Sequence, residues 1–182
     1  MLLHRPVHSA WPDHDPIPPL TVVLDHAARC LTTVEVAILL ESAWNQRAFT
    51  ADEVRRVIAG LPLQHRRALH RVRRDAESGT ETAVRWWLES LGVRVRPQVA
   101  LTGVGRVDLL VGSSWVIECD SRQFHALEQQ YRRDRDRDLV LRSRGYSVTR
   151  LTWEQVFLRW EDTQAMLLRI IRRGDHHRRI SC

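Results

Sequence analysis

Three acidic residues lie close together in the segment GRVDLLVGSSWVIECD, which runs from Gly105 to Asp120. Alternate residues of a β-strand share a face. If the segment forms two strands, Asp108 lies on one face of the first, and Glu118 and Asp120 share one face of the second. Carboxylates gathered in this way can hold a divalent cation or exchange a proton with a substrate. This segment is where we expect chemistry.

The register of the predicted hairpin follows from matching its apolar faces. A two-residue loop would set apolar side chains against acids. A three-residue loop at Gly112–Ser114, a common length, pairs Val111 with Trp115 and Leu109 with Ile117. That register places Asp108 directly opposite Glu118, with Asp120 further along the same face, whereas Cys119 lies on the apolar face.

Two carboxylates at roughly 5 Å across a strand pair repel each other and destabilise the sheet. A bound cation compensates for this repulsion, and Mg²⁺ (or Mn²⁺) is the natural candidate because it takes carboxylate oxygens and keeps several waters. The alternative is a solvent-exposed face, as one face of an antiparallel sheet often is. Leu110 and Val116 share the face with the acids, so it is not uniformly polar, which favours the metal site.

Two further residues are candidates for catalysis. Glu81 lies three residues before Val84 and borders the apolar stripe of its predicted helix. A glutamate at a helix start also stabilises the helix itself, which is the simpler interpretation. His125 follows Asp120 by five residues in a predicted loop, where it could act as a general acid or base near pH 7. A loop histidine without a role is the alternative.

A charged run, RRDRDRD, lies in a predicted helix at about 127–144. One sector of that helix contains, in order, Leu127, Tyr131, Asp134, Asp138 and Leu141. The functional interpretation is that Asp134 or Arg137 faces the acidic cluster or a bound phosphate. The alternative is a solvated helix held by Asp–Arg pairs at i,i+3 and i,i+4.

The elements that must position these residues change character along the chain. Residues 1–19 are rich in proline and predict an extended lead-in, and 20–75 predict a small helical segment with capping boxes at Thr32 and Thr50. Within this segment we expect a basic helix at Leu63–Arg74, and an earlier helix with an apolar stripe at Val34, Ile38, Leu39 and Ala43. A helix with Thr80 as its cap follows. Further on we expect strands at about 93–101, 105–111, 115–120 and 146–151, the helix at 127–144, and one or two helices after a capping box at Thr152. A basic tail covers 175–182. The fold class is therefore mixed α/β, with a central mixed sheet flanked by helices and preceded by the helical segment.

Composition favours a phosphate-bearing partner. The 182 residues hold 28 arginines and no lysine against 22 Asp and Glu, for a net charge of +6. Arginine offers a planar fork that matches phosphate oxygens, although a preference for arginine codons is an alternative cause. The candidate nucleic-acid contacts are Arg106, Arg122, Arg135, Arg137 and Arg150. Three dispersed cysteines form no disulfide framework, and no apolar run is long enough to span a membrane, so we expect a cytoplasmic protein.

The motifs RVDLLV, WVIECDSRQFH and RDRDRDLVLRSRGYSVTR resemble, in order and spacing, a family of bacterial proteins related to the very-short-patch-repair (Vsr) endonucleases. The resemblance covers about residues 76–172 and implies a domain at 76–174 with a PD-(D/E)XK, restriction-endonuclease-like fold. It implies Asp108, Glu118 and the carbonyl of Cys119 as metal ligands, supported by Glu81. Asp120 stands where many such nucleases have a lysine. Asp134, Arg137 and Arg150 match positions of the family.

Two functions remain open from the sequence. The first is a Mg²⁺-dependent endonuclease that hydrolyses DNA, with Asp108 and Glu118 holding the metal and His125 moving the proton. The second is a non-catalytic nucleic-acid-binding or toxin–antitoxin-associated module that keeps the fold. The missing lysine favours the second, whereas the intact acidic pair favours the first. The helices before residue 76 are candidates for binding a protein partner.

Overall fold

The computed structural model of the chain describes residues 18–120 and 128–180. Most of the predicted lead-in, together with Arg122 and His125, lies outside the described residues. The chain divides into two compact units, Met1–Thr82 and Ala83–Cys182. Within the described part of the chain, no helix has the length and apolar character needed to cross a membrane.

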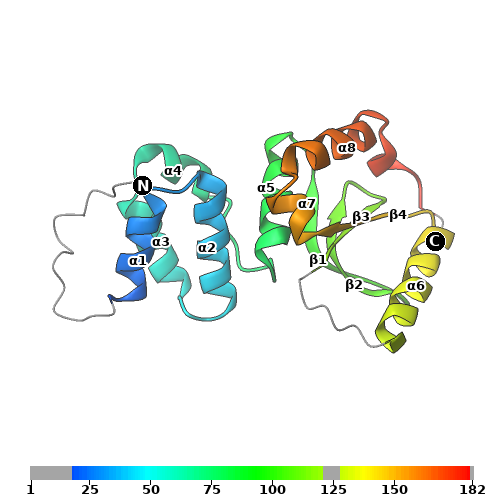
Figure 1. Cartoon of the computed structure of the whole chain (residues 1–182), viewed down its shortest axis with the longest axis horizontal. Helices are drawn as coiled ribbons and strands as arrows, with labels where there is room; N and C mark the ends of the chain where they lie inside the picture. Colours follow the sequence, from blue (N-terminus) through cyan, green and yellow to red (C-terminus); the bar gives the residue numbers. More distant parts are fainter. Residues whose placement is uncertain (1–17, 121–127, 181–182) are drawn as a thin grey trace. The chain divides into compact units, whose positions relative to one another are not determined.

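The described part of the first unit is built from α1 (Leu20–Ala28), α2 (Thr33–Asn45), α3 (Ala51–Gly60) and α4 (Leu63–Leu69) (Figure 1). The capping boxes predicted at the starts of α2 and α3 are confirmed, because Thr32 and Thr50 each exchange hydrogen bonds with the glutamate three residues later. The predicted apolar stripe of α2 is wrong by part of a turn. Its buried positions are Val36, Ala37, Leu40 and Glu41, whereas the expected Val34, Ile38, Leu39 and Ala43 are half-buried.

α4 ends earlier than its basic sequence predicts, at Leu69 rather than near Arg74. The chain that follows α4 contacts the carboxylate of Glu41, which is fully buried in α2. Its Oε1 accepts a hydrogen bond from the amide of Arg73 at 3.2 Å, and its Oε2 accepts one from the hydroxyl of Thr82 at 2.8 Å. A buried carboxylate needs such donors, and the chain after α4 supplies them.

The second unit is a mixed α/β fold, as expected. Helix α5 (Gly79–Ser90) leads into a four-stranded sheet, whose strands are β1 (Val95–Leu101), β2 (Gly105–Val111), β3 (Trp115–Asp120) and β4 (Ser147–Thr152). The strands follow chain order across the sheet, the first three antiparallel and β4 parallel to β3. The parallel step is made through α6 (Glu128–Ser143), and β4 is followed by α7 (Trp153–Phe157), α8 (Trp160–Arg172) and a 3₁₀ turn, η1 (Asp175–His177).

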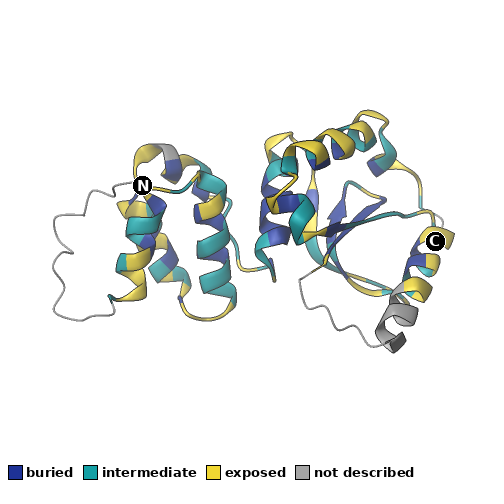
Figure 2. Cartoon of the chain, viewed as in Figure 1, coloured by how far each residue is buried: buried dark blue, intermediate teal, exposed yellow. Residues whose placement is uncertain are grey.

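Helices cover both faces of this sheet (Figure 1), with α6 on one side and α5, α7 and α8 on the other. On the α6 side, Leu141 packs with Val107, Leu110 and Val116, and all four are at most 2% exposed. The strands β2 and β3 are accordingly the most deeply buried part of the unit, and the outer side of α6 is exposed (Figure 2). The expected architecture, a mixed sheet flanked by helices, is confirmed.

The start of α5 differs from the prediction. Ser78 caps the helix, since its hydroxyl accepts a hydrogen bond from the amide of Glu81 at 3.2 Å. Thr80, the predicted cap, lies inside the first turn and is buried. The glycine at 79 permits the shift, because it lets the helix begin two residues earlier against Ile38, whose side chain would lie 2.9 Å from any added Cβ.

The residues after α8 are not simply a basic tail. His176 is buried, and its carbonyl oxygen accepts hydrogen bonds from the amides of Ser113 and Ser114 in the β2–β3 turn, at 2.9 and 3.3 Å. Gly112 has a φ of 60°, and a Cβ on it would lie 2.2 Å from the same oxygen. The turn and the η1 segment therefore fit together only because residue 112 is glycine.

Candidate active site

The hairpin register predicted from the apolar faces is confirmed. Val111 pairs with Trp115, and Leu109 pairs with Ile117. The ladder ends there, although continuing it by one step would place Asp108 opposite Glu118. The two carboxylates therefore lie where the pairing between β2 and β3 gives way.

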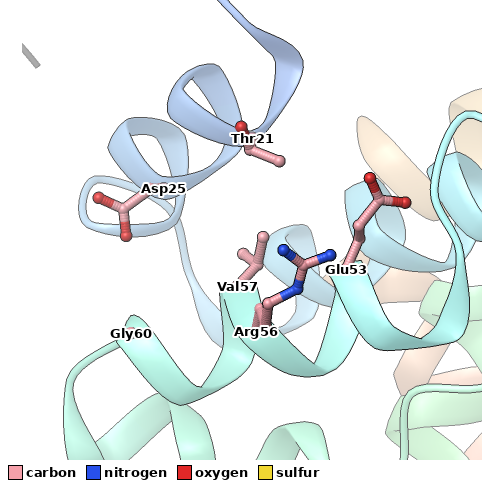
Figure 3. A pocket seen from close by; sticks show the side chains of 6 residues that line it. All are labelled: Thr21, Asp25, Glu53, Arg56, Val57 and Gly60. Carbon is pink, nitrogen blue, oxygen red and sulfur yellow. The ribbon is translucent and has the colours of Figure 1, made fainter.

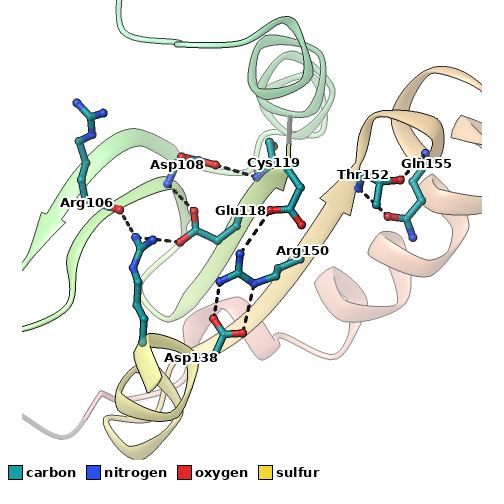
Figure 4. Close-up of polar contacts among 10 residues, drawn as sticks. Arg106, Asp108, Glu118, Cys119, Asp138, Arg150, Thr152 and Gln155 are labelled. Carbon is teal, nitrogen blue, oxygen red and sulfur yellow. Dashed lines mark hydrogen bonds and ion pairs between the residues drawn. The ribbon is translucent and has the colours of Figure 1, made fainter. Parts of the chain in front are cut away.

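Each acid then binds a backbone amide near the other acid (Figure 4). The amide of Asp108 donates a hydrogen bond to Oε2 of Glu118 at 3.3 Å. The amide of Cys119 donates one to Oδ2 of Asp108 at 2.8 Å. Each carboxylate thus accepts a hydrogen bond from a backbone amide at the end of the ladder, and these bonds fix the two side chains relative to each other.

β1 has an unusual residue beside the same position. Its register with β2 passes from Pro97–Leu109 to Val99–Val107, so Gln98 falls opposite Asp108. Gln98 has a φ of 52°, in the left-handed region that non-glycine residues rarely adopt. Strained backbone of this kind tends to cluster at functional sites. Nothing in the spacing of the sequence predicts the conformation of Gln98.

Glu118 is only 5% exposed, and its surroundings disfavour its charged form. Burial and then the neighbouring charge of Asp108 raise the pKa of Glu118 to about 7, against an opposing effect of Arg137. Nη2 of Arg137 lies 3.1 Å from Oε1 of Glu118, an ion-pair distance. That oxygen is nevertheless buried without a hydrogen bond, so the contact with Arg137 lacks hydrogen-bonding geometry. A carboxylate in this position favours a nearby cation.

A second ion-pair network joins β4, β3 and α6. Arg150 of β4 lies 2.9 Å from Oδ1 of Asp138 on α6 and 3.4 Å from Oδ1 of Asp120 at the end of β3 (Figure 4). Asp138 is buried, whereas Asp120 is exposed. The network holds α6 against the sheet, and α6 in turn brings Arg137 to Glu118. Asp138 shares a predicted sector of this helix with Leu141, which was the available signal that its side chain faces the sheet.

The structure thus brings together Asp108, Glu118, Cys119 and Arg137, with Asp120 linked through Arg150. Arg106 is exposed, and its carbonyl oxygen accepts a hydrogen bond from Nη2 of Arg137. Arg135 is exposed on α6, and Asp134 belongs to the same helix with its side chain outside the described residues. The carboxylate of Glu81 accepts a hydrogen bond from the amide of Glu77 at 3.1 Å, which stabilises the start of α5.

The donor set fits a hard divalent cation. Mg²⁺ is commonly held by one or two carboxylates, with waters and substrate oxygens completing its shell. Asp108 and Glu118 supply two carboxylates, one of them with a buried oxygen that accepts no hydrogen bond. Among the described residues, no three His, Cys, Asp or Glu side chains gather into a metal-binding group, so any further ligand here would come from the backbone or from a bound molecule.

A surface pocket of about 310 Å³ lies elsewhere, in the first unit between α1 and α3 (Figure 3). Asp25, Glu53 and Arg56 are among its lining residues. Two of these already serve the fold, since Glu53 closes the capping box of α3 and Asp25 pairs with Arg29 at 3.4 Å. The hydrogen bonds from Thr50 lower the pKa of Glu53, as expected for a capping carboxylate. None of the predicted site residues lines this pocket.

The sheet, its flanking helices and the acid pair define a nuclease-like domain of the restriction-endonuclease-like class. The family model REase_MTES_1575 matches residues 81–171, half of the chain, and the chain belongs to this restriction endonuclease-like family. The match begins at Glu81 and ends in α8, so it covers the whole sheet and the acid pair. No curated protein and no solved structure matches the chain.

Proposed function

We propose that this protein is a metal-dependent DNA endonuclease of the Vsr-like type, with Asp108 and Glu118 holding Mg²⁺ or Mn²⁺. The observation that carries the proposal is the pair itself. Two carboxylates lie at the end of a strand ladder, and one of them keeps a buried oxygen without a hydrogen bond. The fold alone needs no such pair, because an apolar pair would extend the ladder without repulsion.

Asp108 and Glu118 would hold the cation between β2 and β3, with the carbonyl of Cys119 as a third ligand. A bound Mg²⁺ activates water for attack on a phosphodiester and stabilises the charge that builds on the phosphate. The hydrogen bond from the Cys119 amide orients Asp108 before any ligand arrives, which avoids an entropic cost at binding. His125, which lies outside the described residues, is the candidate for moving the proton, and Glu81 and Asp134 are candidates for supporting the pair.

Arg137 is the candidate for the positive charge that many such nucleases take from a lysine. Its guanidinium reaches Glu118 from α6, and its Nε is buried without a hydrogen-bond partner. A guanidinium placed there can bind a phosphate oxygen through two parallel donors. The exposed Arg106 and Arg135 on the same unit, with Arg122, are candidates for contacts to the rest of the DNA backbone.

One observation favours the alternative, a nucleic-acid-binding module without turnover. The Arg137 guanidinium already neutralises part of the charge of Glu118. If that ion pair is permanent, it competes with a cation for the same carboxylate. The alternative then predicts salt-sensitive binding to DNA and no cleavage with any metal.

Cleavage by the full chain decides between the two. Supercoiled plasmid and single-stranded DNA are incubated with wild type and Asp108→Asn, in Mg²⁺, Mn²⁺ or EDTA. We expect metal-dependent cleavage that falls by about 10³-fold in the variant, because losing one ligand removes roughly 4 kcal/mol of stabilisation. The control variant Asp162→Asn makes the same change at an exposed position of α8, and it should cleave DNA at the wild-type rate. Cleavage that persists in EDTA, or in Asp108→Asn, would contradict the metal mechanism.

A further inference from the structure

The described part of the first unit carries a cationic face on α4. At 100° per residue, Arg66, His70 and Arg67 lie on one side of α4 and its C-terminal turn. Their side is exposed, whereas His65 and Leu69 on the other side are buried. The arginines therefore contribute little to the core of the unit, and α4 presents them to the surroundings.

Some other arginines of this unit have acidic partners. Arg29 pairs with Asp25 at 3.4 Å, and Arg55 pairs with Asp52 three residues earlier on the same helix. Arg66 and Arg67, by contrast, have no carboxylate at ion-pair distance within the described part of the chain. The sequence explains the difference, since no Asp or Glu occurs between Glu53 and Asp75.

The face is also held in place. The hydroxyl of Thr33 lies 3.0 Å from Nδ1 of His65, which anchors the buried side of α4. Beyond the helix, the side chain of Asn45 donates a hydrogen bond at 3.1 Å to the carbonyl of Arg74, which is itself exposed. A ligand that binds a preorganised face loses less entropy than one that must order a loop.

We propose that the face formed by Arg66, Arg67 and His70 binds the phosphodiester backbone of a nucleic acid. Guanidinium groups match phosphate oxygens, and adjacent cations without counter-charges repel one another until a polyanion binds. Nucleic acid is the polyanion that the nuclease-like domain in the same chain predicts. The face lies in the other unit from the carboxylate pair, so the inference concerns affinity and does not depend on cleavage.

The test is the salt dependence of binding by the full-length protein. A fluorescein-labelled DNA duplex is titrated in EDTA, where no turnover occurs, and its anisotropy is followed from about 50 to 200 mM KCl. Arg66→Gln with Arg67→Gln should lower the slope of log K against log salt by about 2, since each phosphate contact contributes roughly 0.9. The matched control, Arg29→Gln with Arg55→Gln, removes the same charge from paired positions and should change the slope by less than about 0.5.

Three results would overturn the inference, provided that circular dichroism shows both variants folded. An unchanged slope in the Arg66/Arg67 variant means that the face does not touch the backbone. An equal loss in both variants means that only net charge matters. If poly-glutamate displaces the labelled duplex as strongly as unlabelled duplex does, the face binds an acidic protein instead. Because binding is measured in EDTA and the variants lie outside the nuclease-like domain, the result does not depend on whether the protein cleaves DNA.

Discussion

The two ends of the β2–β3 hairpin are built in opposite ways. At the turn, the amides of Ser113 and Ser114 both donate to the carbonyl of His176, and Gly112 leaves room for that oxygen. At the other end, the ladder stops beside Asp108 and Glu118, whose carboxylates repel each other. The same two strands therefore join a closed end, the Gly112–Ser114 turn whose amides are hydrogen-bonded to His176, to an open end, where the like charges of Asp108 and Glu118 repel.

Within about ten residues, the hairpin therefore has one end that stabilises the fold and another end that is suited to binding a ligand. At the closed end, the amides of Ser113 and Ser114 and the hydroxyl of Ser114 have hydrogen-bond partners within the protein, as buried groups usually do. The open end keeps a buried oxygen of Glu118 without a hydrogen bond, and the cost falls on the free energy of folding. We infer that the turn and its η1 partner stabilise a hairpin that its own acid pair weakens. Three changes test this comparison, in order of decreasing expected effect.

The largest effect should come from pH acting on Glu118. Its pKa is about 7 in the folded protein and 4.5 for an ordinary glutamate, so between these values the folded state holds a proton that the unfolded state has lost. The contribution to stability is therefore full below pH 4.5 and is lost as the pH rises through 7. Urea denaturation in EDTA should show wild type losing up to about 3 kcal/mol relative to Glu118→Gln over this range.

Repeating the urea denaturation with Mg²⁺ in place of EDTA tests the same acid pair. A cation bound by the ionised pair should restore much of the stability that wild type loses at high pH, and it should leave Glu118→Gln less affected. A difference between the two proteins that stays constant with pH would show that the open end carries no unfavourable charge. The comparison of the two ends would then fail.

The second effect should come from Gly112→Ala at the closed end. The substitution combines a left-handed φ of 60° with a Cβ that would lie 2.2 Å from the His176 carbonyl oxygen. Gly92→Ala is the matched control, because Gly92 has a φ of 74° and nothing within 4 Å of its added Cβ. Thermal and urea unfolding should show Gly112→Ala destabilised by about 2 kcal/mol more than the control. Equal losses would mean that the η1 segment does not press on the turn.

The smallest effect should come from Ser114→Ala. The Ser114 hydroxyl is fully buried, donates to the carbonyl of Asp175 at 3.1 Å and accepts from the amide of Arg178 at 2.9 Å. Removing it should cost about 1 kcal/mol by urea denaturation. Ser113→Ala removes an exposed hydroxyl with longer contacts and should cost less. Equal effects would argue against a closed end held by buried hydrogen bonds.

Local patterns predicted much of this fold. Apolar alternation on either side of Gly112–Ser114 determined the register, since a slip by one residue would expose one whole face. The capping boxes at Thr32, Thr50 and Thr152 were likewise predictable, because each depends on residues only three apart. The acid pair followed from the register alone.

Features that depend on distant residues could not be predicted in this way. The path of the chain after α4 involves Glu41, whose carboxylate accepts a hydrogen bond from the amide of Arg73, 32 residues later in the sequence. The pairing of Arg150 with Asp138 needs the orientation of α6 against β4, which no local spacing contains. The close approach of the His176 carbonyl to Gly112 could not be predicted, because the two residues are far apart in the sequence. The turn conformation of Gly112 was by itself a sufficient reason to expect a glycine there.

The parallel pairing of β4 with β3 has a consequence for the order of folding. Strands β1 to β3 are joined by short turns, so their contacts close small loops, whereas β4 can pair only after the chain has passed through α6. Loop closure costs more entropy as the loop lengthens, and non-local pairings form more slowly. An early hairpin would hold Asp108 and Glu118 before Arg137 and Arg150 arrive. The carboxylates would then meet cations from the solution first and the arginines of their own chain afterwards.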